Sequence, residues 1–252
     1  MIPQIIHYCW FGKKPLPPLV EKCIKSWEKY MPQYQIMRWD ESNININAST
    51  FMREAYNLNM YAFVSDYARY KILESYGGIF LDTDVELIKE IDVMGSYAAT
   101  FAINKHVKKN IYFVNPGLFM ASIPHFHLLK EVLSYYDSIH FISDQNKPCL
   151  NYSSPRILTS ILVKKYELQI CDKNQILNDE IQILKSDYFD PINPRKLWGN
   201  KLELKNETCA IHHGAASWIP WEKKVKKYIS IISRNILGDR IVDLIKGTEK
   251  II

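Results

Sequence analysis

Tyr76-Gly77-Gly78-Ile79-Phe80-Leu81-Asp82-Thr83-Asp84 is the stretch of sequence that decides the fold. Its two glycines end a predicted helix over residues 61–76 and turn the chain into a short apolar strand at residues 79–81. Two carboxylates follow at the tip of that strand. Carboxylate oxygens attract hard cations such as Mg2+ and Mn2+, which complete their shells with phosphate oxygens and water. The stretch therefore predicts a metal held against a diphosphate, whereas the alternative for an isolated acid pair is a solvated turn.

The residues before this stretch predict a βαβ unit. An apolar run at residues 2–8 predicts a strand, helical spacing of apolar residues predicts a helix from about residue 18, and residues 34–39 predict a second strand. Parallel strands bring their carboxyl ends, and hence ligands, to one edge of a sheet. We expect Trp10 and Trp39 near that edge.

The rest of the chain alternates further strands with helices, so the fold class is α/β. Strands are predicted at residues 85–88, as a continuation beyond the acid pair, and at 111–121, 181–184 and 209–213, with helices at 126–136 and 155–165. Asn115-Pro116-Gly117 interrupts the run at 111–121. Asn115 either lines the acceptor side of a site or belongs to an ordinary turn, for which this tripeptide is typical.

Composition limits the classes of function. The chain has 252 residues, 47% of them apolar, which is enough for one domain with a sizeable core. The net charge of +5 suits anionic partners such as nucleotide diphosphates and does not indicate nucleic acid. Five cysteines without a CxxC pair indicate neither a disulfide framework nor a zinc site. With no leader or membrane-span pattern, the sequence predicts a cytoplasmic protein.

Residues 221–246 predict a basic amphipathic helix. Apolar residues such as Val225, Ile229 and Ile232 oppose a group of lysines that includes Lys223 and Lys227. Two interpretations stay open: the helix docks on the protein's own core, or it makes a peripheral contact with an anionic membrane surface.

Asp66 and Arg69 lie three residues apart on the predicted helix at 61–76 and therefore share a face. They form either a simple intrahelical ion pair or a polar surface that holds sugar hydroxyls beside a phosphate site.

Three parts of the sequence resemble glycosyltransferase family 32, whose members are similar to the catalytic domains of the large clostridial glucosylating toxins. The resemblance rests on three blocks, at residues 2–12, 62–84 and 210–218, and it is loose between about residues 101 and 208. It implies a GT-A fold, which is a Rossmann-like mixed sheet flanked by helices. We expect a catalytic domain over residues 1–220 and a C-terminal helical extension over 221–252.

The resemblance also implies the roles of individual residues. Asp84 would bind Mn2+ or Mg2+ directly, and Asp82 would support the metal and the ribose or sugar. Asp66 and Arg69 would hold the donor sugar, and Trp10 would stack on the nucleobase. His212 or His213 would complete the metal shell, while Ser217 and Trp218 would approach the diphosphate. Phe80 departs from the pattern, because relatives commonly carry tyrosine there.

By resemblance, the chain is a retaining bacterial hexosyltransferase that takes a nucleotide-sugar donor, with UDP-sugars favoured. Its acceptor would be a saccharide or lipid-linked oligosaccharide in capsule, lipopolysaccharide or exopolysaccharide synthesis. One alternative is a non-catalytic domain that binds sugar nucleotides or glycans. Another is a haloacid-dehalogenase-type phosphatase, in which Asp239 and Asp243 would supply a late acidic motif. The phosphatase is disfavoured, because its first acid motif would normally come near the N-terminus.

Overall fold

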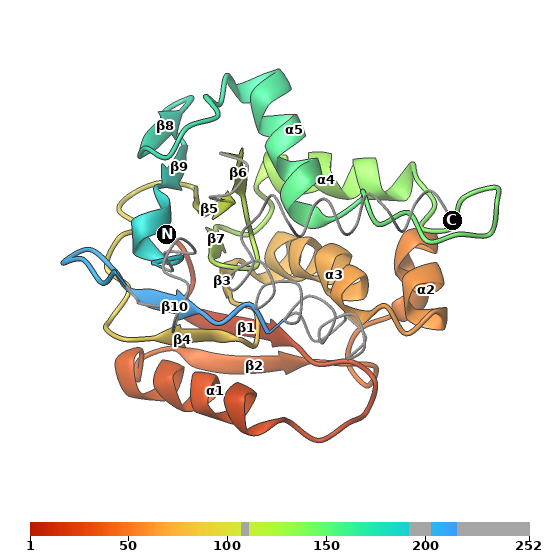
Figure 1. Ribbon diagram of the computed structural model, residues 1–252, viewed down its shortest axis with the longest axis horizontal. Helices are drawn as coiled ribbons and strands as arrows, with labels where there is room; N and C mark the ends of the chain where they lie inside the picture. Colours follow the sequence, from red (N-terminus) through yellow and green to blue (C-terminus); the bar gives the residue numbers. More distant parts are fainter. Residues whose placement is uncertain (107–110, 192–202, 216–252) are drawn as a thin grey trace, which may run out of the picture.

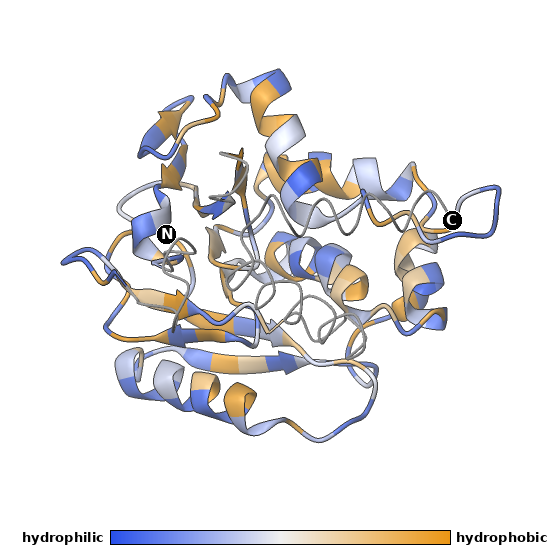
Figure 2. Ribbon diagram, viewed as in Figure 1, coloured by the Kyte–Doolittle hydropathy of each residue, from blue (hydrophilic) through white to orange (hydrophobic). Residues whose placement is uncertain are grey.

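The N-terminal residues fold into the predicted βαβ unit (Figure 1). In the computed structural model, which describes residues 1–106, 111–191 and 203–215, β1 (Ile5–Cys9) and β2 (Gln35–Trp39) are parallel neighbours connected by α1 (Pro18–Tyr30). Proline at the start of α1 suits a helix, because its fixed φ matches the first turn. Hydrophobic and hydrophilic residues alternate along α1 (Figure 2), and its apolar side is buried.

The central sheet is mixed and has the strand order β2-β1-β3-β7-β5-β9-β8, with β6 paired to β5. The remaining strands of this sheet are β3 (Gly78–Phe80), β5 (Ala99–His106), β6 (Ile111–Val114), β7 (Met120–Ser122), β8 (Gln175–Leu177) and β9 (Ile181–Leu184). The strands β1, β2, β3, β5 and β9 run in one direction, and β7 runs opposite. Their carboxyl ends and the start of β7 therefore meet at one edge, here called the carboxyl edge.

Helices cover the sheet on both sides. The helices α2 (Thr50–Asn57), α3 (Tyr61–Tyr76), α4 (His127–Asp137) and α5 (Ser154–Tyr166) pack together on one face, and α1 lies on the other side (Figure 1). Two short 3-10 turns, at Ile46–Ala48 and Ser186–Tyr188, complete the described helical structure. Alternate residues of β3 face the two sides, because Phe80 belongs to one core cluster and Ile79 to the other.

The glycine pair after α3 makes the turn that the sequence predicts. Gly77 ends the helix at a φ of +64°, and Gly78 follows at +99°, both of which disfavour residues with a side chain. A Cβ on Gly78 would lie 2.6 Å from the carbonyl oxygen of Ile5 in β1. Glycine therefore lets β3 pair closely with β1 and carries the acid pair directly to the carboxyl edge.

The region after the acid pair differs from the prediction. We expected residues 85–88 to continue the strand, but β4 (Val85–Leu87) leaves the central sheet and pairs antiparallel with β10 (Ala210–His212). The cause is a turn, in which the Val85 N–H donates to the Asp82 carbonyl at 3.0 Å. The strands β5 and β8 and the helix α2 were not predicted from the sequence, whereas the other elements predicted within the described residues are present with small shifts of their ends.

The cysteines, the length of the helices and the C-terminal residues bear on the remaining predictions. All five cysteines are free thiols. Within the described ranges, none of the helices is long and apolar enough to cross a membrane. The predicted helix at 221–246 and the boundary between residues 220 and 221 lie outside the described residues, so both stay predictions.

His7 connects three elements of the core. It is fully buried on β1, and its Nε2 lies 2.9 Å from the carbonyl oxygen of Gly77, to which it can donate. The indole N–H of Trp39 donates to His7 Nδ1 at 3.1 Å. Burial lowers the pKa of His7 to about 4, although the contact with Gly77 opposes the shift. The imidazole is therefore neutral at pH 7.

Because His7 takes up a proton more readily when the chain unfolds, the unfolded state binds more protons between about pH 4 and pH 6.5. Stability should rise with pH through that window. We expect His7 to remove about 2 kcal/mol of unfolding free energy between pH 7 and pH 5. Urea unfolding at both pH values measures it. In His7→Gln the difference between the two pH values should shrink by this amount, and an unchanged difference would contradict the assignment.

Candidate active site

A buried arginine joins two acids at the carboxyl edge. Arg69 on α3 lies 3.1 Å from Asp66 and 3.2 Å from Asp82, measured from Nη2 to the nearer carboxylate oxygens. The exposed side-chain fractions are 11% for Asp66, 4% for Arg69 and 34% for Asp82. The ion-paired row therefore begins inside the protein and ends at an accessible carboxylate.

Burial and pairing act in opposite directions on these charges. Burial disfavours the charged form of Arg69, but Asp82 and Asp66 outweigh it and raise its pKa above the usual value. Burial raises the pKa of Asp66 to about 6, against the opposing effects of Arg69 and of the Ser154 N–H, which donates to Asp66 at 3.0 Å. The row therefore places the Arg69 guanidinium between two acids. Such an arrangement can orient hydroxyl groups of a bound sugar.

Phe80 packs against the guanidinium of this row. Its side chain is fully buried, and the Arg69 guanidinium lies 5.0 Å from the centre of its ring. A cation over an aromatic face is attracted by the ring quadrupole, with a strength of roughly 0.5–2 kcal/mol. The residue that departs from the family pattern therefore contacts the Arg69 guanidinium with the face of its ring.

Gly117 closes the other side of Asp82. The Asp82 N–H donates to the Gly117 carbonyl at 2.9 Å, and the Gly117 N–H donates to Asn115 Oδ1 at 3.0 Å. A Cβ on Gly117 would lie only 2.1 Å from Asp82 Oδ2. Asn115 thus acts in the turn, and the turn positions a glycine against the acid. Sequence reasoning missed this role of Gly117, because the tripeptide indicates a turn without indicating what the turn contacts.

The second acid of the pair contacts the ribbon formed by β4 and β10. His212 Nε2 lies 3.3 Å from Asp84 Oδ1, and the Ala215 N–H donates to Asp84 Oδ2 at 2.7 Å. Burial acts to raise the pKa of Asp84, but His212 and the Ala215 N–H hold it below its usual value. Burial likewise opposes charge on His212, whose pKa is nevertheless raised by Asp84 and, more weakly, by Asp82 and Asp190.

The two adjacent histidines point to different partners. His213 Nε2 lies 2.8 Å from Glu86, which also pairs with Lys22 at 2.8 Å. The antiparallel pairing of β10 with β4 explains the difference, because successive side chains of an extended chain alternate in direction. Of the two imidazoles, that of His212 contacts the Asp84 carboxylate, whereas His213 contacts Asp84 through its backbone N–H, which donates to the Asp84 carbonyl at 2.9 Å. The sequence left this choice between the two histidines open.

Asp190 is a site candidate that the sequence analysis did not identify. It follows β9 at the carboxyl edge, accepts a hydrogen bond from Asn104 Nδ2 at 2.7 Å, and is electrostatically coupled to His212. Burial raises its pKa, although His212 and the Lys105 N–H oppose the shift. Its position after a predicted strand was the available signal, but the strand that carries Asn104 was not predicted.

Trp10 lies directly after β1 at the same edge and is half-buried. Its backbone N–H donates to the Trp39 carbonyl at 2.8 Å, and its indole N–H donates to the Lys14 carbonyl at 2.7 Å. These bonds fix the indole while using none of its ring face. Ser217 and Trp218, which were expected near the diphosphate, lie outside the described residues.

The donor set fits a divalent ion that is shared with a phosphate ligand. Asp84 and His212 offer an oxygen and a nitrogen 3.3 Å apart, close to the separation of about 3 Å expected for adjacent ligands of an octahedral Mg2+ or Mn2+ ion. Asp82 supplies a second accessible carboxylate. Among the described residues, no three His, Cys, Asp or Glu side chains form a metal cage on their own. An ion here would complete its shell with diphosphate oxygens and water.

Comparisons with known proteins agree with this arrangement. Residues 17–101, which include the acid pair, match the family described as "Glycosyltransferase sugar-binding region containing DXD motif". The chain is 28% identical over 235 residues to an uncharacterized glycosyltransferase of Acanthamoeba polyphaga mimivirus, covering 90% of this chain and 87% of that protein. It is 32% identical over 111 residues to inositol phosphoceramide mannosyltransferase 1 of Schizosaccharomyces pombe, covering 40% and 34% of the two chains.

Among solved structures, the PaToxG glycosyltransferase has a similar fold. It superposes with a TM-score of 0.51 at 17% identity, covering 65% of this chain and 70% of that one. The mixed sheet flanked by helices is thus the GT-A fold that the sequence predicts. The family match and both relatives agree with a transferase rather than with the phosphatase or the non-catalytic binding domain.

Gly117→Ala tests whether the turn at residues 115–117 positions Asp82. The added methyl group would displace the Asp82 carboxylate, so we expect metal-dependent nucleotide release from a sugar donor to fall at least about tenfold. The control is Gly95→Ala, which adds a methyl group 3.3 Å from the Tyr97 ring and backbone strain at a φ of +54°, and should lower the melting temperature without lowering nucleotide release. Release should be measured beside the melting temperature. Full activity in a folded Gly117→Ala protein would remove Gly117 from the site.

Proposed function

We propose that this chain, a glycosyltransferase with a DXD-containing sugar-binding region, transfers a hexose from a nucleotide-sugar donor to a saccharide acceptor. The observation that carries the proposal is the junction of two charged groups at the carboxyl edge. One is the row Asp66–Arg69–Asp82, and the other is the pair Asp84–His212. The first suits sugar hydroxyls and the second suits a diphosphate-bound cation.

The donor would lie along the carboxyl edge. Trp10 would stack on the nucleobase, Asp82 would meet the ribose or the sugar, and Asp66 with Arg69 would hold the hexose hydroxyls. We favour a UDP-sugar by resemblance. The fixed partners of Arg69 support this orientation, because a pre-formed donor set orders the sugar without reorganising during the reaction.

Asp84 and His212 would hold Mn2+ or Mg2+, with Asp82 as a supporting ligand. When bound, the ion supplies Lewis-acid stabilisation of the negative charge that develops on the departing diphosphate. The pKa of Asp84 is held below its usual value, which keeps the carboxylate ionised and ready to bind a cation. His213 is left out of this set, because Glu86 is its partner.

Transfer would proceed with retention of the anomeric configuration, as the resemblance implies. Front-face transfer and double displacement both stay open, since no group at the edge has been assigned as a nucleophile. The acceptor would be a saccharide or lipid-linked oligosaccharide in the synthesis of capsule, lipopolysaccharide or exopolysaccharide. The setting would be bacterial, by resemblance, and cytoplasmic, for which the five unpaired cysteines give support because they suit a reducing compartment. A peripheral membrane contact through residues 221–252 belongs to the same proposal.

The proposal predicts a sharp contrast within one ribbon. Asp84→Asn and His212→Gln should each lower Mn2+-dependent release of UDP or GDP, by about 10²–10³-fold for Asp84→Asn. His213→Gln and Glu86→Gln alter the neighbouring pair and should retain most of the activity. Release would be measured over a panel of nucleotide sugars at several Mn2+ concentrations. Equal losses in all four variants would point to a structural role of the ribbon, and no turnover with any donor or acceptor would count against the transferase.

Trp10 provides an independent test of donor placement. Stacking on a base contributes about 1–3 kcal/mol, so Trp10→Ala should weaken nucleotide binding by roughly 5- to 150-fold. Trp10→Phe keeps an aromatic face and should lose less. Calorimetry with UDP and with GDP, each in the presence of Mn2+, measures the affinities, and urea unfolding tests whether the fold is intact. If Trp10→Ala binds nucleotide as tightly as the natural chain, Trp10 does not belong to the base site.

A further inference from the structure

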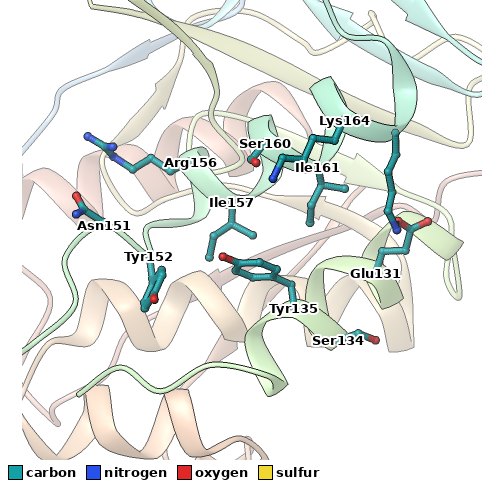
Figure 3. Close-up of a pocket in the computed structure, with 11 residues that line it drawn as sticks. Glu131, Ser134, Tyr135, Asn151, Tyr152, Arg156, Ile157, Ser160, Ile161 and Lys164 are labelled. Carbon is teal, nitrogen blue, oxygen red and sulfur yellow. The ribbon is translucent and has the colours of Figure 1, made fainter. Parts of the chain in front are cut away.

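A groove lies between α4 and α5 (Figure 3). Its lining residues, between positions 131 and 165, are far in sequence from the Asp82-Thr83-Asp84 motif. Its volume is about 530 Å³, within the range of about 300–1,000 Å³ that is typical of small-ligand sites. Tyr135 from α4 and Ile157 from α5 point toward one another across it, and Ile161 continues the apolar surface. The groove can therefore accommodate an apolar or ring-shaped group.

One side of the groove carries unpaired positive charge. Arg156, Ser160 and Lys164 line it at successive intervals of four residues, so they form a stripe along one face of α5. The stripe spans about 12 Å at 1.5 Å per residue. Within the described ranges, neither Arg156 nor Lys164 has an ion pair, and Arg156 instead lies 5.7 Å from the centre of the Phe113 ring.

The acidic residue of the groove is already neutralised. Glu131 pairs with Lys165 at 2.7 Å and accepts a hydrogen bond from the Tyr166 hydroxyl at 2.8 Å. Because Glu131 and Lys165 neutralise one another, the net positive charge of the groove comes from Arg156 and Lys164. Two cations beside an apolar surface complement a ligand that is both anionic and amphipathic.

One end of the groove is connected to the proposed sugar site through the start of α5. Its lining begins at Asn151 and Tyr152, just before the first turn of α5, and the Ser154 N–H of that turn donates to Asp66. Asp66 in turn pairs with Arg69 at the carboxyl edge. The end of the groove at Asn151 and Tyr152 is thus joined to the charged row through the Ser154–Asp66 hydrogen bond.

We propose that the groove between α4 and α5 binds the anionic, amphipathic part of the acceptor, with Arg156 and Lys164 contacting a phosphate or a carboxylate. The acceptor role rests on the proposed transferase function, but the binding site itself does not. An apolar portion of the ligand would lie against Ile157, Ile161 and Tyr135. Ser160, between the two cations, offers a hydroxyl donor to the same anion.

Calorimetry with three probes below their micelle concentrations tests this assignment. Dodecyl phosphate and dodecyl glucuronide carry the two candidate anions, and dodecyl maltoside is the neutral comparison. Each is titrated into the 252-residue chain, alone and with saturating UDP or GDP plus Mn2+. The variant is Arg156→Gln combined with Lys164→Gln, and the matched control is Lys130→Gln, an exposed lysine of α4 that lies outside the groove lining.

We expect at least one anionic probe to bind at least tenfold more tightly than dodecyl maltoside, with or without nucleotide. The double variant should lose at least tenfold in that affinity, and Lys130→Gln should not. Whichever anionic probe binds more tightly identifies the anion. Displacement by nucleotide, equal binding of the neutral probe, equal losses in Lys130→Gln or no binding would overturn the proposal. Nucleotide release from sugar donors is a separate measurement, so failure of the transferase function would be recognised independently.

Discussion

The site depends on how a single buried guanidinium is neutralised. Arg69 is buried, and an isolated charge at that depth costs several kcal/mol. Asp66 offsets the charge from one turn earlier on α3, and Asp82 offsets it from the end of β3. Because Asp66 and Arg69 belong to the same helix, the ion pair with Asp82 is the one that joins α3 to the end of β3. The same acids face the proposed sugar position.

This constraint extends beyond the ion pairs. Asp66 also accepts the Ser154 N–H, so the start of α5 is positioned by the same charged row, and Tyr70 contacts the Ser154 hydroxyl at 2.7 Å. The groove between α4 and α5 therefore has a fixed relation to the carboxyl edge. Donor and acceptor surfaces would be aligned by packing within the protein, with α3 as the element that they share.

Local patterns made part of this arrangement predictable. The βαβ unit, α3 and its glycine turn are coded by periodicity and turn chemistry within a few residues, and the acid pair could be located from the same stretch. The β4–β10 ribbon could not, because it depends on pairing between distant segments. For the same reason, the sequence does not predict the contact between Gly117 and Asp82 or the position of Asp190. The choice between His212 and His213 likewise required the register of the ribbon.

The hydrogen bond from the Ala215 N–H to Asp84 joins residues 131 positions apart in the chain. At a synthesis rate of about 5–20 residues per second, the segment that completes the acid pair is made roughly 7–26 s after it. A chain still growing on the ribosome therefore contains Asp84 before its partners His212 and Ala215 have been made, whereas Arg69, the partner of Asp82, is already present. The contacts of Asp84 thus require synthesis through residue 215, and translation products that stop earlier would carry the acid motif without them.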